Sequence, residues 1–222
     1  MNKSLIVMCN GPSLKEIDFK DLEGQDVIGM NGAYRFFYKN NFWPKYFGCF
    51  DTRVTENHAE AYAKLIEESP IERFFLLKRV SESEKLTVLK LNGGIGNFSK
   101  NFETFGYGGN TGANCCQVGI CLGYKKIILI GADCNYKEVV DGAVQDGGGL
   151  VMAKTPDKNP NYFFDSYQME GDSYNYPQAS TFHQPAWNSL AVFAKYCGVD
   201  IVNCTTSSLT CFRKSSLKDE VQ

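Results

Sequence analysis

The chain lacks the features of a membrane-spanning, exported or zinc-binding protein. Its 222 residues contain no apolar run near the roughly 18 residues that cross a bilayer. The opening residues do not resemble a signal peptide. The nine cysteines form no CxxC pair, which structural zinc sites usually contain. We therefore expect a soluble cytoplasmic protein with reduced thiols, and association with the inner face of a membrane is left open.

An excess of either charge is also lacking. The 23 Lys and Arg residues nearly balance the 25 Asp and Glu residues, for a net charge of −2. No basic stripe exists to attract a polyanion, so nucleic acid is not expected as the main partner. Histidine occurs only at His58 and His183, which limits imidazole chemistry to two positions. His58 lies in a helical pattern whose exposed face predicts a structural or inert residue.

Short apolar runs alternate with helical patterns along the chain. Strands are predicted at 4–9, 26–30, 46–50, 74–78, 86–91, 126–130 and 200–203, and helices at 55–69, 113–122 and 185–196. Ser13 is the expected cap of a further short helix. This alternation predicts an α/β fold, a mostly parallel sheet with helices on both faces, in a single domain over 1–222. Residues 135–182 are rich in Gly, Pro and Tyr without periodicity, and are expected to form a long mobile lid within that domain.

Asn or Asp follows the end of five predicted strands. These residues are Asn10, Asn31, Asp51, Asp133 and Asn203. Ligands of open α/β sheets bind beyond the carboxyl ends of the strands, so this set predicts a polar pocket. The alternative is that these residues only form turns and helix caps, which Asn and Asp also favour.

Two glycine-bearing loops accompany these strand ends, and neither is a GxGxxG or P-loop motif. In the first, at 10–13, Gly11 allows a ligand to approach the backbone, and Ser13 with nearby amides can face a phosphate. The second, at 108–112, precedes a predicted helix, where free N–H groups can hold a phosphate or sugar hydroxyls. Each loop has the alternative of being an ordinary flexible turn.

The order of these motifs carries a family resemblance. CNGPSL at 9–14, Asn31, NTG at 110–112, LGYKKI at 122–127, IGAD at 130–133, His183 and NCTTSSL at 203–209 together resemble the bacterial sialyltransferases of glycosyltransferase family 42. The chain is also similar to the motility-accessory-factor and lipopolysaccharide-associated glycosyltransferases, which the PNYFF segment at 160–164 resembles more. The resemblance implies a modified Rossmann-like, GT-A-type fold and an inverting, metal-independent transferase. It further implies a CMP-activated, sialic-acid-like donor, a glycan acceptor and no other cofactor.

The resemblance also assigns roles to residues. The donor would be bound by Asn10, Gly11, Pro12, Ser13, Asn31, Asp51, Asn110, Thr111, Gly112 and Asp133. His183 falls at the position of the general base, and an imidazole with an ordinary pKa near ~6.5 suits that task. Tyr136 and Tyr162 are the expected donors of hydrogen bonds to the departing phosphate, although Tyr167 and Tyr174 are alternatives to Tyr162.

Three features depart from the sialyltransferase pattern. The family's tyrosine pair is matched only approximately, since Tyr136 sits one residue late after Asp133. Gly108 stands where those enzymes have an Arg, so a cation that could pair with the donor's carboxylate or hold the acceptor is absent. Asp51 stands where they have an Asn, which adds a negative charge near the donor.

Two other functions fit the same residues. One is a Mg-dependent pyrophosphokinase-like transferase, although the sequence lacks a clear pair of metal-binding carboxylates. The other is a binding protein that keeps the nucleotide pocket without catalysis. Assembly into a homo-oligomer is left open.

Overall fold

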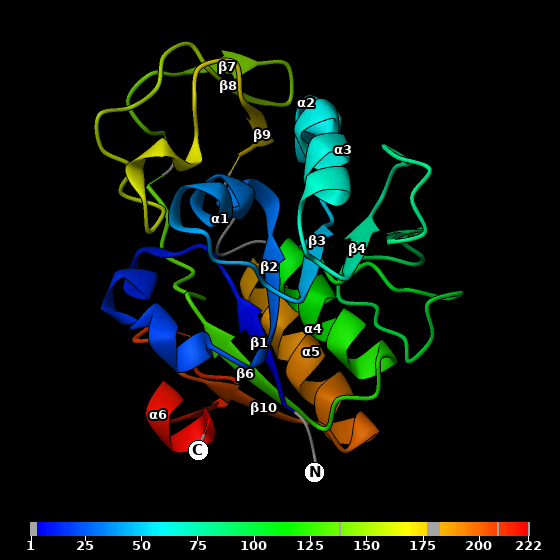
Figure 1. Ribbon diagram of the computed structural model, residues 1–222. Coiled ribbons are helices and arrows are strands. Elements are labelled where there is room, and N and C mark those ends of the chain that lie inside the picture. The colour runs from blue at the N-terminus through cyan, green and yellow to red at the C-terminus, as the bar shows by residue number, and fades with distance from the viewer. Residues whose placement is uncertain (1–3, 138, 177–182, 208, 222) are drawn as a thin grey trace.

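The computed structural model describes residues 4–137, 139–176, 183–207 and 209–221. Its centre is an eight-stranded parallel sheet in the order β11-β10-β6-β1-β2-β3-β4-β5 (Figure 1). The strands are β1 (Ser4–Met8), β2 (Asp26–Met30), β3 (Tyr46–Cys49), β4 (Arg73–Leu76), β5 (Leu86–Val88), β6 (Lys126–Ile130), β10 (Asp200–Asn203) and β11 (Arg213–Lys214). The expected α/β architecture with a parallel sheet is confirmed.

Alternation along the strands divides the core between the two faces of the sheet. Leu5 and Val7 of β1 face one core, which α4 (Thr111–Cys121) and α5 (Gln184–Cys197) complete. Ile6 and Met8 face the other core. That core is completed by α1 (Tyr34–Asn40), α3 (Ala59–Glu68) and α6 (Leu217–Val221). Helices therefore cover both faces, because parallel strands bury both of their sides.

The expected helices are present with shifted boundaries. The predicted helix at 55–69 is two helices, α2 (Thr52–Asn57) and α3, which meet at His58. Short 3-10 helices also occur at Pro12–Glu16, Phe19–Leu22, Asn31–Ala33 and Asp165–Tyr167. The pattern did not reveal α1, α6 or β11, whose sequences are short or polar.

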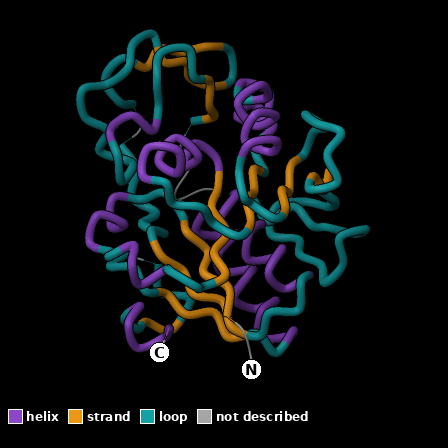
Figure 2. Tube along the Cα trace, viewed as in Figure 1, coloured by secondary structure: helices purple, strands orange, loops and turns teal. Residues whose placement is uncertain are grey.

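The segment expected as an irregular lid contains a sheet of its own. β7 (Ala143–Asp146), β8 (Gly149–Met152) and β9 (Ser173–Asn175) pair antiparallel in the order β7-β8-β9. Figure 2 shows these strands apart from the main sheet, beside the helices that follow β2 and β3. Residues 177–182 of the expected lid lie outside the described residues.

Strand order places a topological switch point at β1. The chain runs from β1 outward through β2, β3, β4 and β5, and β6 then pairs with the opposite edge of β1. The loops after β1 and β6 therefore diverge to opposite faces and leave a crevice between them.

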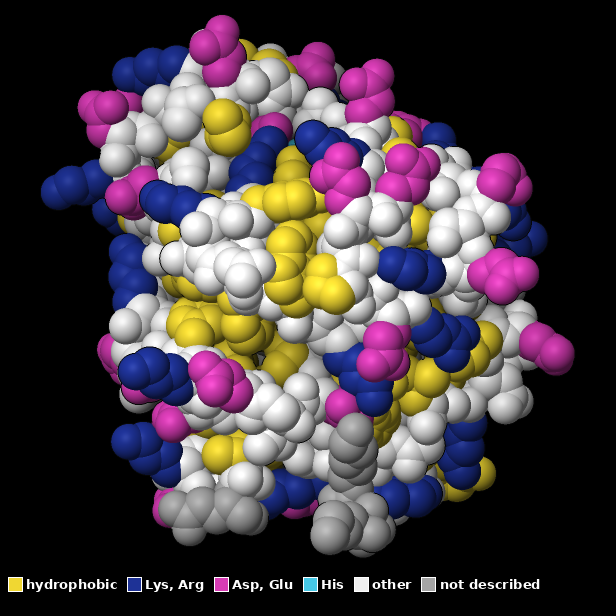
Figure 3. Space-filling view, in the orientation of Figure 1, with side chains coloured by type: hydrophobic (Ala, Val, Ile, Leu, Met, Phe, Trp, Pro, Cys, Tyr) yellow, Lys and Arg dark blue, Asp and Glu magenta, His cyan; other side chains and the backbone are white. Residues whose placement is uncertain are grey.

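Charges of both signs are mixed on the surface. Lys and Arg are interspersed with Asp and Glu on the face shown in Figure 3 and form no continuous basic stripe there. No helix within the described ranges is long and apolar enough to cross a membrane. All nine cysteines are free thiols.

Candidate active site

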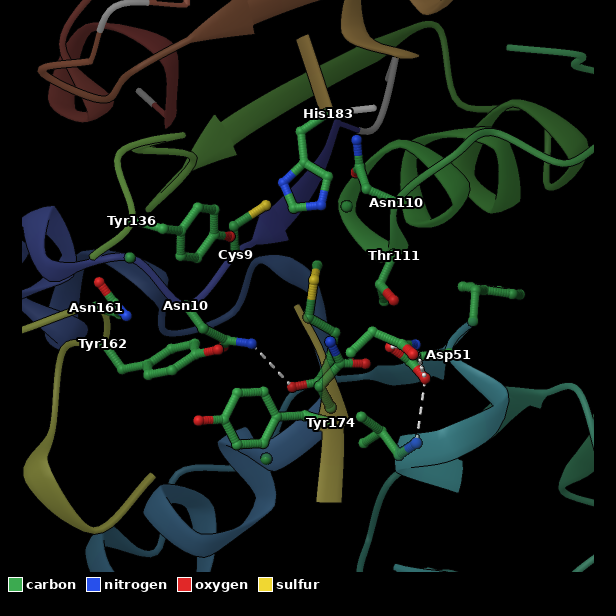
Figure 4. Close-up of a pocket in the computed structure, with 18 of the residues that line it drawn as sticks. Cys9, Asn10, Asp51, Asn110, Thr111, Tyr136, Asn161, Tyr162, Tyr174 and His183 are labelled. Carbon is green, nitrogen blue, oxygen red and sulfur yellow. Dashed lines mark hydrogen bonds between the residues drawn. The ribbon is translucent and has the colours of Figure 1, made fainter. Parts of the chain in front are cut away.

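A cavity of about 570 Å³ lies at the carboxyl ends of the strands. Eleven of the residues singled out from the sequence line it: Asn10, Gly11, Asn31, Asp51, Asn110, Thr111, Gly112, Asp133, Tyr136, Tyr162 and His183. Figure 4 shows that the β1 loop, the start of α4, the inserted segment and the start of α5 all contribute to its wall. The expected pocket is thus present, although Pro12 and Ser13 are not among its described lining residues.

Three asparagine side chains leave an amide atom without a partner at this cavity. Asn10 Oδ1, Asn31 Oδ1 and Asn110 Nδ2 are buried and have no hydrogen-bond partner within the described part of the chain. Asn10 is only 7% exposed, and its Nδ2 donates to the Tyr167 hydroxyl at 2.9 Å and to the Met30 carbonyl at 3.2 Å. Buried polar atoms are normally paired, so these atoms are available to a ligand.

Asn110 both caps a helix and lines the cavity. Its Oδ1 accepts a 2.8 Å bond from the Ala113 N–H and caps α4, while its unpaired Nδ2 lies at the cavity. The helix cap therefore fixes the side chain that presents the amide group.

In the loop after β1, Gly11 and Ser13 both pack against Asp133. A Cβ atom on Gly11 would overlap the Asp133 carboxylate, so protein atoms occupy the space on that side of the glycine. Ser13 donates from both its N–H and its hydroxyl to Asp133 Oδ2, each at 3.0 Å, and does not cap the helix. The prediction that Ser13 caps this helix is thus wrong, because its N–H and hydroxyl both donate to the Asp133 carboxylate after β6.

Gly112 also accommodates protein rather than open space. A Cβ atom there would lie 2.9 Å from the Trp187 ring and 3.0 Å from Cys9 Sγ. The glycine lets the first turn of α4 pack directly against α5, the helix that begins beside His183.

His183 presents its ring to the cavity. It occupies the N-cap position of α5 but makes no side-chain capping bond with the described residues. Its ring meets that of Tyr136 edge to face, with centroids 5.5 Å apart. Burial lowers the pKa of His183 below its ordinary value of 6.5, so the imidazole is neutral at physiological pH and able to accept a proton.

The tyrosines of the inserted segment divide into two groups by the state of their hydroxyls. Tyr167 accepts bonds from Asn10 Nδ2 and the Gly32 N–H, and Tyr174 donates to Met152 Sδ at 3.5 Å. The hydroxyls of Tyr136 and Tyr162 have no such partner within the described ranges, and both residues line the cavity. Burial raises the pKa of both phenols, so both remain protonated donors. Tyr162 also stacks on Tyr167, with centroids 3.7 Å apart.

Asn161 connects the two segments that carry these free hydroxyls. Its Oδ1 accepts from the Lys137 N–H at 2.7 Å, and its Nδ2 donates to the Lys137 carbonyl at 2.8 Å. Lys137 follows Tyr136, and Asn161 precedes Tyr162. The reciprocal pair therefore fixes the backbones of the two tyrosines relative to each other.

His58 is the clearest residue that sequence reasoning misplaced. It is 7% exposed, at the junction of α2 and α3, and lines the cavity instead of facing solvent. Its Nδ1 lies 3.1 Å from the Tyr34 hydroxyl, and its Nε2 lies 3.4 Å from Asp172 Oδ1. Desolvation lowers the pKa of His58 to about 4 in spite of the carboxylate.

The buried positions Thr55, His58 and Tyr62 follow one helical period across α2 and α3, so His58 continues their inward face. In the sequence, Ala59 and Ala63 indicate a different inward face, which places His58 on the exposed side.

Asn203 is the strand-end residue that does not reach the cavity. Its Nδ2 donates to the Leu209 carbonyl at 3.1 Å, and its Oδ1 accepts from the Thr205 N–H at 3.0 Å. It is fully buried in the loop after β10, so its role in this structure is the turn-forming alternative. No cluster of three potential metal ligands occurs among the residues that the structure places.

Comparison with known proteins agrees with the fold. No family model and no curated protein sequence matches the chain. The sialyltransferase CstII from Campylobacter jejuni, in complex with the substrate analogue cytidine-5'-monophosphate, is 17% identical with a TM-score of 0.54, over 96% of this chain and 85% of that one. CstII in complex with CMP-3FNeuAc gives 18% identity and the same TM-score, over 97% and 86% of the two chains. The MAf glycosyltransferase from Magnetospirillum magneticum AMB-1 is 14% identical with a TM-score of 0.56, over 98% of this chain but 34% of its own.

These similarities confirm, at the level of the fold, the resemblance seen in the motifs. The chain has a sialyltransferase-like glycosyltransferase fold over nearly its whole length.

Proposed function

We propose that the protein is an inverting glycosyltransferase that moves a sugar from a nucleotide donor to a hydroxyl of a glycan acceptor. The observation that carries this proposal is the arrangement around one cavity. A neutral imidazole and two phenol hydroxyls that have no partner among the described residues line the cavity together with the strand-end amides of β1 and β2. The similar fold of a sialyltransferase bound to CMP supports CMP as the nucleotide.

In this proposal His183 removes the proton from the acceptor hydroxyl as it attacks the anomeric carbon. The new glycosidic bond forms as the bond from that carbon to the phosphate oxygen breaks, and the nucleotide leaves with the electron pair. The hydroxyls of Tyr136 and Tyr162 donate to the phosphate as its negative charge increases. Preorganised donors of this kind are worth about 3 kcal/mol each in a transition state.

The carboxylates at the cavity give no reason to assign a metal ion. Asp51 and Asp133 are the strand-end carboxylates at the cavity, and both already accept hydrogen bonds from the protein. We expect transfer to persist in a chelator, whereas inactivation by EDTA with recovery in Mg²⁺ would support the pyrophosphokinase-like alternative.

A thermal-shift panel of CMP, CDP, UDP, GDP and ATP, each with and without Mg²⁺, tests the nucleotide. The proposal predicts stabilisation by CMP that is independent of Mg²⁺, since a ligand at 100 times its Kd adds about 2.7 kcal/mol of stability. Stabilisation by ATP only in the presence of Mg²⁺ would contradict it. CMP binding without release of CMP from any donor would favour a catalytically inactive relative.

A further inference from the structure

The charges that line the cavity are of one sign. Asp51, Asp133 and Asp172 contribute carboxylates, and no Lys or Arg is present among the described lining residues. Residues 177–182, which the structure does not describe, contain no Lys or Arg in the sequence. A donor in this cavity already carries a phosphate, so every further negative charge on it adds to the repulsion.

The two arginines near the cavity are already paired. Arg35 holds Asp172 with bonds of 2.6 and 2.8 Å, which neutralises that carboxylate. Arg53 pairs with Asp146 and donates to the Ser173 hydroxyl at 2.5 Å. Neither guanidinium is free to receive a carboxylate from a ligand.

Asp51 has no cationic partner among the residues that the structure describes. Its Oδ1 accepts from the Val54 N–H at 3.1 Å, and both of its oxygens accept from Asn175 Nδ2, at 3.1 and 3.0 Å. All of these donors are neutral, so they fix the carboxylate in place without cancelling its charge. Figure 4 shows Asp51 on the side of the cavity opposite Tyr136 and Tyr162. If those tyrosines hold the phosphate, Asp51 faces the sugar.

The loop before α4 has no room for a compensating side chain. A Cβ atom on Gly108 would lie 2.8 Å from the Phe98 ring and 3.0 Å from Asn114 Oδ1. A long basic side chain at this position would need the surrounding core to move, so the loop is packed for glycine.

We infer that Asp51 selects a donor whose sugar carries no carboxylate, and that its oxygens accept hydrogen bonds from hydroxyl or amino groups of that sugar. The inference rests on the proposed function and narrows it. An acidic sugar would place its carboxylate in a partly desolvated site beside a fixed negative charge, where an unpaired anion is costly. A hydroxyl or amino group instead supplies the donors that the carboxylate can accept. On this inference the sugar is not the sialic-acid-like one that the motif resemblance implies.

Binding of CMP and of CMP-3FNeuAc, whose sugar bears a carboxylate, tests this inference by calorimetry. We expect wild-type protein to bind CMP-3FNeuAc at least tenfold more weakly than CMP. Asp51→Asn is expected to reduce that gap at least tenfold while the Kd for CMP stays within twofold. The control Asp141→Asn removes an exposed carboxylate that pairs with Lys154 outside the cavity, and is expected to leave both Kd values unchanged.

The outcomes separate the two proposals. Wild-type protein that binds CMP-3FNeuAc as tightly as CMP or more tightly overturns the inference and leaves the nucleotide assignment intact, and this comparison needs no variant. A gap that persists in Asp51→Asn overturns the role of Asp51. Failure of CMP itself to bind contradicts the proposed donor, and the inference falls with it.

Discussion

The rings of Tyr136 and His183 meet edge to face with their centroids 5.5 Å apart, although 46 residues separate them in the chain. Tyr136 belongs to the loop after β6, and His183 stands at the start of α5. The contact brings the proposed base beside a proposed donor to the leaving phosphate, so the two halves of the reaction share one wall of the cavity.

His183→Ala is expected to lower kcat by about 10²–10⁴-fold and to leave the Kd for CMP nearly unchanged, because the base acts on the acceptor and not on the nucleotide. Since burial lowers the pKa of His183, the acid side of the kcat/KM profile should have its midpoint below pH 6.5. Release of CMP from the donor, measured with and without acceptor, checks this. Wild-type turnover in the variant would remove His183 from the mechanism.

Asn161→Ala is expected to reduce kcat with little change in KM, since it releases the Lys137 backbone and with it the fixed spacing of Tyr136 and Tyr162. Tyr136→Phe alone should reduce kcat by about 100-fold. The loss in the double variant should be smaller than the product of the two single losses, because part of the effect of Asn161→Ala acts through the Tyr136 hydroxyl that Tyr136→Phe removes.

The matched control for this experiment is Asn40→Ala, which removes an exposed amide on α1 that bonds the Phe36 carbonyl. If the kcat loss of the double variant equals the product of the two single losses, Asn161 does not act through Tyr136.

Acidification is expected to destabilise the protein through His58. The unfolded residue binds a proton near pH 6.5, whereas the folded one does so only near pH 4. The unfolded state therefore binds more protons between these values, and the free energy of unfolding falls as the pH drops through that window. His58 alone should contribute a loss of roughly 2–3 kcal/mol between pH 7 and pH 4.5.

Urea unfolding of wild-type protein and His58→Gln at both pH values measures this term. The variant should lose less stability on acidification, because glutamine does not titrate. An equal loss in the two proteins would show that His58 is not the titrating group.

Gly11→Ala is expected to destabilise the fold by about 1–3 kcal/mol, because the added methyl group competes with the Asp133 carboxylate for the same space. Gly148→Ala is the control, since a Cβ atom there has no neighbour within 4 Å. Unfolding midpoints in urea compare the two variants. Equal stability of both would mean that the β1 loop can move away from Asp133.

Much of the fold and most of the site could be predicted from the sequence. Apolar runs such as LIVM at 5–8 and IILI at 127–130 are buried on both sides, so they reveal central parallel strands. Side chains at the ends of parallel strands share one edge, which is why Asn10, Asn31 and Asp51 could be grouped without coordinates.

The rest depended on contacts that no local pattern encodes. In the inserted segment β7 is exposed and β9 has only three residues, so neither shows the alternation that marks a half-buried strand. β8 is apolar and buried but spans only four residues, too few to stand out from the surrounding loop.

His58 lies on the buried face of α2 and α3 with Thr55 and Tyr62, a face that small residues such as Ala59 and Ala63 obscure in the sequence. The bond from Ser13 to Asp133 joins positions 120 residues apart. These contacts exist only in the folded chain.

A crystal structure of the protein with CMP is the most direct test of the account. We expect the nucleotide to lie in the strand-end cavity, with its phosphate within about 3 Å of the Tyr136 and Tyr162 hydroxyls. The nucleoside should lie against Asn10 and Asn31. His183 should stand on the sugar side of the phosphate. CMP bound outside this cavity, or with its phosphate on the Asp51 side, would contradict the account.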